Sequence, residues 1–158
     1  MKNIIFPLFI LCLLLISCEE DPSVDITVMP EETSIGANTF GCLIDGWLYV
    51  GGRYQEISWM GIYQKSIEFI YIDPPVEESE MKVQVICKPG KILSFTILAP
   101  EEGKRCNYID ASLNGQNIFS PGEAYITRFD KTNKIISGRF EGGEITEGRF
   151  DVIYDKIE

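Results

Sequence analysis

Histidine is absent from this chain of 158 residues. It is the usual general base near neutral pH, the partner of serine and cysteine nucleophiles, and a common zinc ligand. Its absence removes the central group of most hydrolase mechanisms. No nucleophile-elbow, phosphate-loop or dinucleotide-binding motif takes its place. We therefore expect a protein that is not an enzyme and that uses no metal and no cofactor.

Basic side chains are scarce as well. The chain has 14 lysines and arginines against 24 aspartates and glutamates, which gives a formal net charge of −10. A protein that binds nucleic acid needs a basic surface to neutralise the phosphates. Attachment to anionic lipid headgroups likewise needs clustered lysine or arginine. The charge balance therefore argues against nucleic acid as a partner and leaves a protein or a glycan.

A hydrophobic run long enough to span a membrane is also missing. The apolar stretch from Ile4 to Ile16 has 13 residues and is interrupted by Pro7, whereas a spanning helix needs about 20. It follows Lys2 and has the length of a signal-peptide core. The stretch ends in Leu15-Ile16-Ser17-Cys18, which resembles the lipobox of bacterial lipoproteins, where the cysteine takes the lipid and a small residue precedes the cut.

We expect residues 1–17 to be removed as a lipoprotein signal peptide and Cys18 to carry lipid. Two or three acyl chains on one residue anchor a protein stably in a membrane. A secretory signal with an incidental cysteine is the alternative. An acidic cluster that resembles the export signal of surface lipoproteins in Bacteroidota follows at once: Glu19, Glu20 and Asp21. A solvated linker explains these acids too. Residues 18–35 are predicted to be an acidic tether, and the predicted location is the outer membrane, facing the cell surface.

Cysteine is limited to five residues, of which Cys12 leaves with the signal peptide and Cys18 carries lipid. The three that remain are Cys42, Cys87 and Cys106. An exported chain can hold one disulfide among them. We favour Cys87 with Cys106, because Cys106 lies in a loop-like stretch that can reach back. Three separate buried thiols are the alternative.

The 3.6-residue apolar period of an amphipathic helix is not seen anywhere in the chain. The segments are short, rich in Ile, Val, Phe, Tyr and Thr, and separated by Gly, Pro, Asn and Asp, which is typical of strands and turns. We expect one all-β domain over residues 36–158, an antiparallel β-sandwich or small barrel of about 8–10 strands. The predicted strands are 39–44, 47–50, 53–59, 62–72, 80–87, 92–98, 107–113, 124–130, 134–141 and 145–154.

Asp45-Gly46 between two apolar runs is a strong hairpin signal, because a type I′ turn needs positive φ at both central residues. A two-residue turn places Ile44 opposite Trp47 and Cys42 opposite Tyr49, with all four on one face of the hairpin. We expect that face to be buried, since Trp and Tyr are large residues of β cores.

An exposed aromatic platform is the competing interpretation of this region. Rings on the surface of a β-sandwich can hold sugar rings by stacking. Five large aromatic residues fall within 17 positions and are the candidate ligand platform: Trp47, Tyr49, Tyr54, Trp59 and Tyr63.

A second hairpin contains the tripeptide Gly-Arg-Phe twice, at 138–140 and 148–150. A two-residue turn at Gly142-Gly143 would put the two phenylalanines on opposite faces, whereas an odd loop from Gly142 to Glu144 puts both on one face. Register follows the buried face, so we predict the odd loop with a bulged turn. That register sets Arg139 opposite Glu147.

Motifs at the two ends of the domain support a family resemblance. They are Gly-Ala-Asn-Thr-Phe-Gly-Cys-Leu-Ile-Asp-Gly at 36–46, Ile-Thr-Arg-Phe-Asp at 126–130, Ile-Ile-Ser-Gly-Arg-Phe at 135–140 and Gly-Arg-Phe-Asp-Val at 148–152. Together with the lipobox they resemble a family of small Bacteroidota lipoproteins of uncharacterised function. The resemblance does not extend to residues 51–120. It implies an envelope location and a β fold, and it implies no activity.

These observations favour a non-catalytic surface module that binds a glycan or a protein. A purely structural envelope component is the alternative. A hydrolase is less favoured, because paired catalytic carboxylates must face each other across a cleft and the sequence identifies no such pair.

Overall fold

The computed structural model describes residues 27–52, 56–57, 63–74, 77–87, 90–118 and 121–157. These residues contain no helix, and the predicted all-β fold is confirmed. The strands are β1 (Thr39–Ile44), β2 (Trp47–Gly51), β3 (Glu56–Ile57), β4 (Tyr63–Gln64), β5 (Ile67–Ile72), β6 (Glu80–Cys87), β7 (Lys91–Leu98), β8 (Arg105–Leu113), β9 (Gln116–Asn117), β10 (Gly122–Asp130), β11 (Ile135–Gly142), β12 (Ile145–Ile153) and β13 (Asp155–Ile157).

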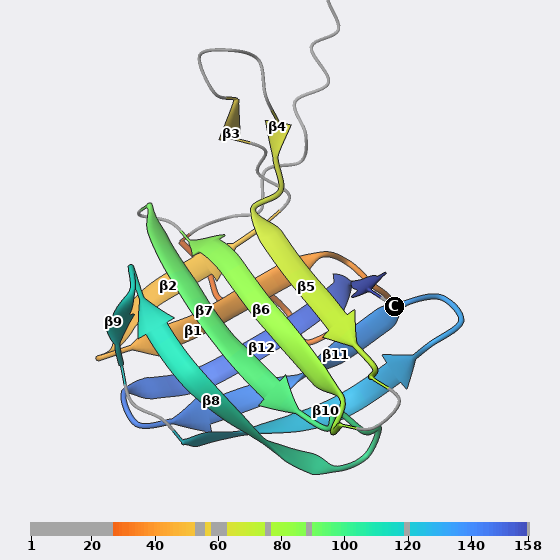
Figure 1. The fold of residues 1–158 in the computed structure, drawn as a ribbon. Helices are drawn as coiled ribbons and strands as arrows, with labels where there is room; N and C mark the ends of the chain where they lie inside the picture. The colour runs from red at the N-terminus through yellow and green to blue at the C-terminus, as the bar shows by residue number, and fades with distance from the viewer. Residues whose placement is uncertain are drawn as a thin grey trace, which may run out of the picture.

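One 11-stranded sheet makes up most of the fold, in the order β13-β5-β6-β7-β8-β10-β11-β12-β1-β2, with β9 paired to β8. It curls into a half-barrel, so that β5 to β8 form a front layer across a back layer of β10, β11, β12, β1 and β2 (Figure 1). β3 and β4 form a separate two-stranded ladder. The pairing is not wholly antiparallel as predicted, because β13 runs parallel to β5.

The chain joins the two layers at both sides of the half-barrel. In β8, the stretch from Tyr108 to Leu113 pairs with β7, and the stretch from Arg105 to Tyr108 pairs with β10. On the other side the chain leaves β12, passes through the buried Tyr154 and enters β13, which pairs with β5. The hydrophobic core therefore lies between the layers and is bounded by continuous chain on either side.

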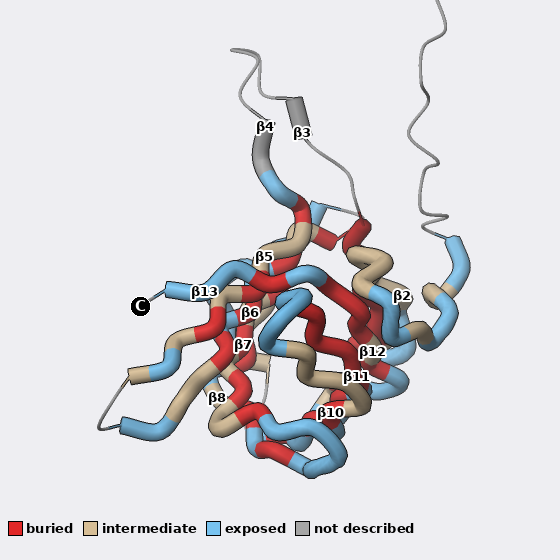
Figure 2. Tube along the Cα trace, turned by 90° about the vertical axis from the view of Figure 1, so that its right-hand side faces the viewer, coloured by how far each residue is buried: buried red, intermediate tan, exposed pale blue. Residues whose placement is uncertain are grey.

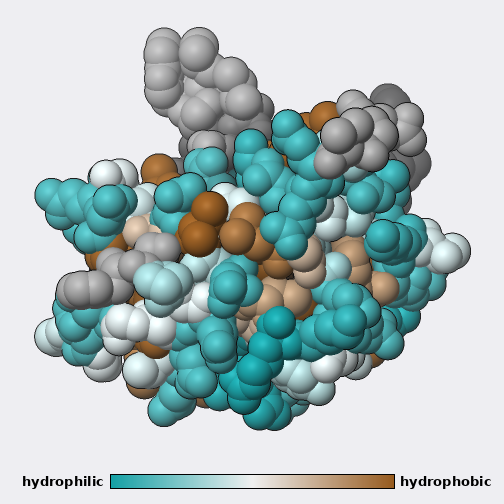
Figure 3. Space-filling model, turned by 60° about the horizontal axis from the view of Figure 1, so that its bottom comes forward, coloured by the Kyte–Doolittle hydropathy of each residue, from teal (hydrophilic) through white to brown (hydrophobic). Residues whose placement is uncertain are grey.

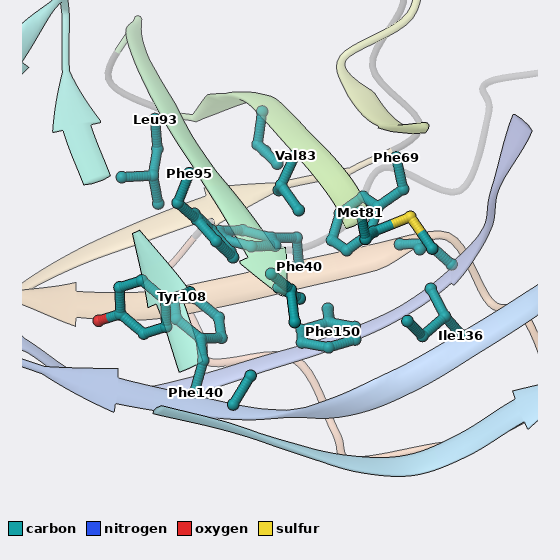
Figure 4. Packing of buried hydrophobic residues seen from close by; sticks show 14 of the residues in the cluster. Phe40, Phe69, Met81, Val83, Leu93, Phe95, Tyr108, Ile136, Phe140 and Phe150 are labelled. Carbon is teal, nitrogen blue, oxygen red and sulfur yellow. The ribbon is translucent and has the colours of Figure 1, made fainter. Parts of the chain in front are cut away.

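Aromatic rings fill the space between the layers (Figure 4). The ring centroid of Phe140 lies 5.2 Å from that of Phe40, 5.0 Å from that of Phe95 and 6.3 Å from that of Tyr108. Buried and exposed residues alternate along the strands (Figure 2), because successive side chains of a strand point to opposite faces. Side chains therefore occupy the interior between the two layers (Figure 4).

Most predicted strands match the structure within two residues at each end. The single strand predicted over 62–72 is two strands, β4 and β5, separated at Lys65 and Ser66. The short strands β9 and β13 were not predicted, because two or three residues are too few to show a period of two in the sequence.

The Asp45-Gly46 turn is confirmed, with φ angles of 51° and 78°. The register is the predicted one, with Ile44 opposite Trp47 and Cys42 opposite Tyr49. The expected burial of the aromatic face is wrong for Trp47, which is 75% exposed, and Tyr49 is only half-buried. Trp47 is the first residue after the turn, on a strand at the edge of the sheet, so only one neighbouring strand flanks it.

We expect Trp47→Ala to leave the free energy of unfolding within about 0.5 kcal/mol of the wild-type value, as is usual for exposed side chains. Phe40→Ala is the matched control, because Phe40 lies on the same hairpin and is fully buried. That change should lower the free energy of unfolding by about 3–5 kcal/mol. Urea unfolding of the two variants measures the difference. Equal losses for Trp47→Ala and Phe40→Ala would contradict the exposed position.

The second hairpin contains a bulge that the sequence interpretation misplaced. The turn is Gly143-Glu144, and the register shifts just before it. Both phenylalanines of the Gly-Arg-Phe copies are buried on one face, as predicted. Arg139, however, lies opposite Arg149 instead of Glu147.

The two Gly-Arg-Phe copies pair with each other in antiparallel register. Gly138 lies opposite Phe150, and Phe140 lies opposite Gly148. A Cβ atom at Gly138 would lie 2.9 Å from Cζ of Phe150, and one at Gly148 would lie 2.7 Å from Cδ1 of Phe140. Each ring thus covers the glycine on the other strand, an arrangement known to stabilise glycine in sheets. The arginines between them emerge side by side on the outer face.

The predicted disulfide between Cys87 and Cys106 is wrong, and all three described cysteines are buried free thiols. Cys87 faces Lys91 at the start of β7, whereas Cys106 donates a hydrogen bond of 3.3 Å to the carbonyl of Ala99, just beyond the end of β7. The eight residues of β7 keep the two thiols about 25 Å apart along the strand. Burial raises the pKa of the Cys87 thiol to about 12, so it is not a reactive nucleophile.

Candidate functional site

The residues that precede β1 lie on the outer face of the back layer. We call residues 29–37 the strap. A Cβ atom at Gly41 would lie 2.5 Å from Cδ of Pro30, so the strap can lie this close to β1 only because that position is glycine. Arg149 of β12 donates a hydrogen bond of 3.2 Å to the Pro30 carbonyl. The predicted tether therefore ends earlier than residue 35, because these residues belong to the folded domain.

Asp151 of β12 holds the strap in place. Its carboxylate is fully buried and accepts five hydrogen bonds. The Thr33 hydroxyl donates at 2.5 Å and the Ser137 hydroxyl at 2.7 Å. The remaining donors are the backbone N–H groups of Ile35, Gly36 and Ala37, at 3.0, 2.8 and 3.1 Å.

The pKa of Asp151 reflects two opposing effects. Burial alone would raise it, but the hydrogen bonds from Thr33, Ser137 and the strap backbone stabilise the charged form more strongly, so the pKa is lowered. Every donor around the carboxylate comes from the chain itself. Asp151 is therefore a structural anchor for the strap and is not a group poised for proton transfer.

Beside the strap, four residues form a row across four neighbouring strands of the outer face. Arg105 of β8 lies opposite Tyr125 of β10, and Tyr125 lies opposite Arg139 of β11. Arg139 in turn lies opposite Arg149 of β12. The Tyr125 residue is 41% exposed. Three of the chain's five arginines are thus aligned on one surface of a protein whose net charge is negative.

This row forms the floor of a shallow groove of about 490 Å³. The acidic residues that line the groove are Glu32, Glu123, Glu141 and Glu147. We call it the arginine groove. Its volume lies in the range of small-molecule binding sites, about 300–1,000 Å³. The outer surface seen from below the half-barrel is mainly hydrophilic, with apolar side chains gathered in a smaller area (Figure 3).

Two ion pairs neutralise part of the groove. Glu32 of the strap binds Arg139 through both carboxylate oxygens, with Nε to Oε1 at 2.8 Å and Nη2 to Oε2 at 2.6 Å. Arg105 pairs with Glu123 at 3.1 Å. Exposed pairs of this kind contribute little to stability. The groove therefore offers an exposed ring flanked by planar donors and carboxylate acceptors, an arrangement that can stack on a ligand and form hydrogen bonds with it.

The structure describes only part of the predicted platform. Trp47 is exposed and Tyr49 packs partly against the core. Tyr54 and Trp59 lie outside the described residues, and of Tyr63 the structure describes only its place in β4. The predicted lipidation and export residues also lie outside the described part of the chain: Cys18, Glu19, Glu20 and Asp21.

The arginine groove was missed at the sequence level. The signal that could have pointed to it is the doubled Gly-Arg-Phe tripeptide. If both phenylalanines face the core, both arginines must face outward on adjacent strands. Tyr125 carried no comparable signal, because its partners Arg105 and Arg139 are distant in the chain.

Comparisons with protein-family models, with curated proteins and with solved structures found no match for this chain. Within the described residues, no helix is long and apolar enough to cross a membrane. The same residues contain no cluster of three or more Cys, Asp or Glu side chains placed to hold a metal ion.

Proposed function

We propose that this protein is a lipid-anchored lipoprotein of the bacterial outer membrane whose β domain faces the cell surface and binds a glycan or a protein without catalysing a reaction. The observation that supports binding most directly is the arginine groove, with exposed Tyr125 between Arg105 and Arg139. Tyrosine and arginine are the side chains most enriched in recognition surfaces. The lipobox at Cys18 supports the anchor.

The absence of catalysis is supported by the position of the groups whose pKa values are raised most by burial. Cys42, Cys87 and Tyr108, whose pKa values are raised mainly by burial, belong to the core and not to the groove. Active sites usually place such groups in an accessible cleft. Arg105 and Arg139 of the groove form ion pairs with Glu123 and Glu32, which suits recognition better than proton transfer.

A structural envelope component without a ligand is the second candidate. The pairing of Arg139 with Glu32 and of Arg105 with Glu123 favours it, because both ion pairs form without any ligand. A ligand must compete with these pairs, whereas a structural role needs no such competition.

The anchor is tested on the protein purified from its native membrane. Mass spectrometry of the N-terminal peptide should show a chain that begins at Cys18 with acyl groups attached. Protease treatment of intact cells should release the domain, and alanine at Glu19, Glu20 and Asp21 should reduce that release. An unmodified Cys18 would contradict the anchor. Unchanged release in the alanine variant would show that the acidic cluster is only a linker and not an export signal.

Binding is tested with a glycan array and with capture from envelope extracts, using the soluble domain. We expect a specific ligand whose affinity falls about fivefold to thirtyfold in Tyr125→Ala, since loss of one stacked ring removes about 1–2 kcal/mol. Trp47→Ala is the matched control, because it removes another exposed ring on a different strand. If neither the glycan array nor the capture experiment detects a ligand, the structural role is favoured. Loss of binding in Trp47→Ala alone would move the site to the first hairpin.

A further inference from the structure

Two arginines face each other at the centre of the arginine groove. Arg139 and Arg149 are directly paired on adjacent antiparallel strands. Like charges in that position are unfavourable for a sheet unless something neutralises them. Glu32, which belongs to the strap and not to the sheet, forms an ion pair with Arg139. Arg149 donates a hydrogen bond to the Pro30 carbonyl of the strap. Both guanidinium groups thus have partners in a separate segment.

We propose that Arg139 and Arg149 bind the carboxylate of an acidic sugar chain. In the absence of the sugar, the Glu32 carboxylate occupies this site, and the sugar carboxylate displaces it. The proposal rests on the proposed binding function and assigns the ligand class. Guanidinium groups recognise carboxylates through paired, parallel hydrogen bonds. Glu32 already makes that contact with Arg139, so the structure shows the geometry in which an external carboxylate fits.

Displacement of Glu32 does not require the strap to leave. The ion pair is exposed, with 66% of the Arg139 side chain and 35% of the Glu32 side chain accessible, and such pairs are weak. The strap is held independently by four hydrogen bonds to Asp151. Rotation of the Glu32 side chain is therefore enough to open the site. Arg149 donates a hydrogen bond to the Pro30 carbonyl, and a guanidinium carries five donors, so further donors can serve the ligand.

A sugar fits this site better than an acidic peptide. Extended peptides usually bind by adding a strand to a sheet edge, whereas β10, β11 and β12 lie inside the sheet with both neighbours paired. Recognition must then come from side chains alone. Glu141 and Glu147 line the groove and would repel a second carboxylate nearby, but they can accept hydrogen bonds from hydroxyl groups. One carboxylate among several hydroxyl groups, next to a ring that can stack on Tyr125, describes a uronic acid.

The test uses the soluble domain from residue 19 onward, with calorimetric titration of an acidic trimer, in which one galacturonic acid is linked to two galactose units, and of the matching neutral trimer of galactose. We expect saturable binding of the acidic trimer at least tenfold tighter than of the neutral one. Arg149→Gln should weaken binding of the acidic trimer at least tenfold. Glu32→Gln should strengthen it about threefold to tenfold, because it removes the competing carboxylate. Lys82→Gln is the control for charge, since Lys82 lies on β6 of the front layer, and it should leave the affinity unchanged.

Each of the following outcomes would contradict a different part of the proposal. Equal binding of both trimers, lost in Tyr125→Ala but not in Arg149→Gln, would overturn the carboxylate site and leave the proposed binding function standing. Tighter binding of a triglutamate peptide than of the acidic trimer would overturn the sugar assignment. An unchanged affinity in Glu32→Gln would overturn the role of Glu32. No saturable binding of the acidic trimer would overturn the inference, and the glycan array would then decide separately whether any ligand exists.

Discussion

Asp151→Asn is expected to lower the free energy of unfolding by about 3–5 kcal/mol. A hydrogen bond to a charged group contributes about 1.5–3 kcal/mol, and a buried donor left without an acceptor costs about 1–3 kcal/mol. Asparagine keeps one oxygen acceptor, but its amide nitrogen would face donors from either Thr33 and Ala37 or Gly36 and Ser137. The strap should therefore detach from the sheet in this variant.

Urea unfolding measures the loss, and hydrogen exchange at the amides of Ile35, Gly36 and Ala37 reports whether the strap has detached. Asp155→Asn is the control, because the Asp155 side chain is exposed and forms a surface ion pair with Lys65. It should change stability by less than about 0.5 kcal/mol. Retained protection of the three amides in Asp151→Asn would contradict the anchoring role.

The same carboxylate makes stability depend on pH. The pKa of Asp151 is lowered in the folded state, so its contribution is fully present above the unfolded-state value of about 3.9. It is lost as pH falls below that value toward the folded pKa. The wild type should therefore lose stability in this acid range more steeply than Asp151→Asn does. Parallel curves for the two proteins would show that Asp151 is not the group responsible.

Phe140→Ala is expected to lower the free energy of unfolding by about 3–5 kcal/mol, since it leaves a cavity among the rings. The Phe140 ring contacts the rings of Phe40 and Phe95 and covers the bare position at Gly148. The total free energy of unfolding of a domain of this size is about 5–15 kcal/mol. The variant should unfold at much lower urea concentration or fail to accumulate.

Phe140→Leu separates the loss of volume from the loss of the aromatic contact. It keeps most of the hydrophobic volume and should lose less than half as much stability as Phe140→Ala. Ile92→Ala, at a residue with 41% exposure on β7, is the surface control. If Phe140→Ala and Ile92→Ala had equal urea midpoints, Phe140 would not be central to the core.

Local signals predicted the fold well, because strand alternation and turn chemistry act over a few residues. The Asp45-Gly46 turn and the shared buried face of Phe140 and Phe150 are both present. The pairing within the second hairpin was wrong, because a bulge of one residue changes which residues are opposite without changing which face they occupy. The predicted burial of Trp47 was wrong for a different reason. The register shows which face of the sheet a residue occupies, but it does not show whether another layer covers that face.

The candidate site could not be predicted, because its residues meet only through the register of four strands. Arg105, Tyr125, Arg139 and Arg149 come from β8, β10, β11 and β12, and each pairing depends on the turn or bulge before it. The strap was misread as a linker for a related reason. Its acidic composition with Pro30 resembles a tether, and the partner that orders it, Asp151, lies more than 110 residues later.

The pairing of β1 with β12 brings the two ends of the domain together, with Thr39 opposite Asp151. Contacts between residues so far apart in the chain form late and make folding slow, typically milliseconds to seconds. The hairpins β5-β6 and β6-β7 are local and can form first. The strap can bind Asp151 only when β12 is in place, so the strap becomes ordered late in folding.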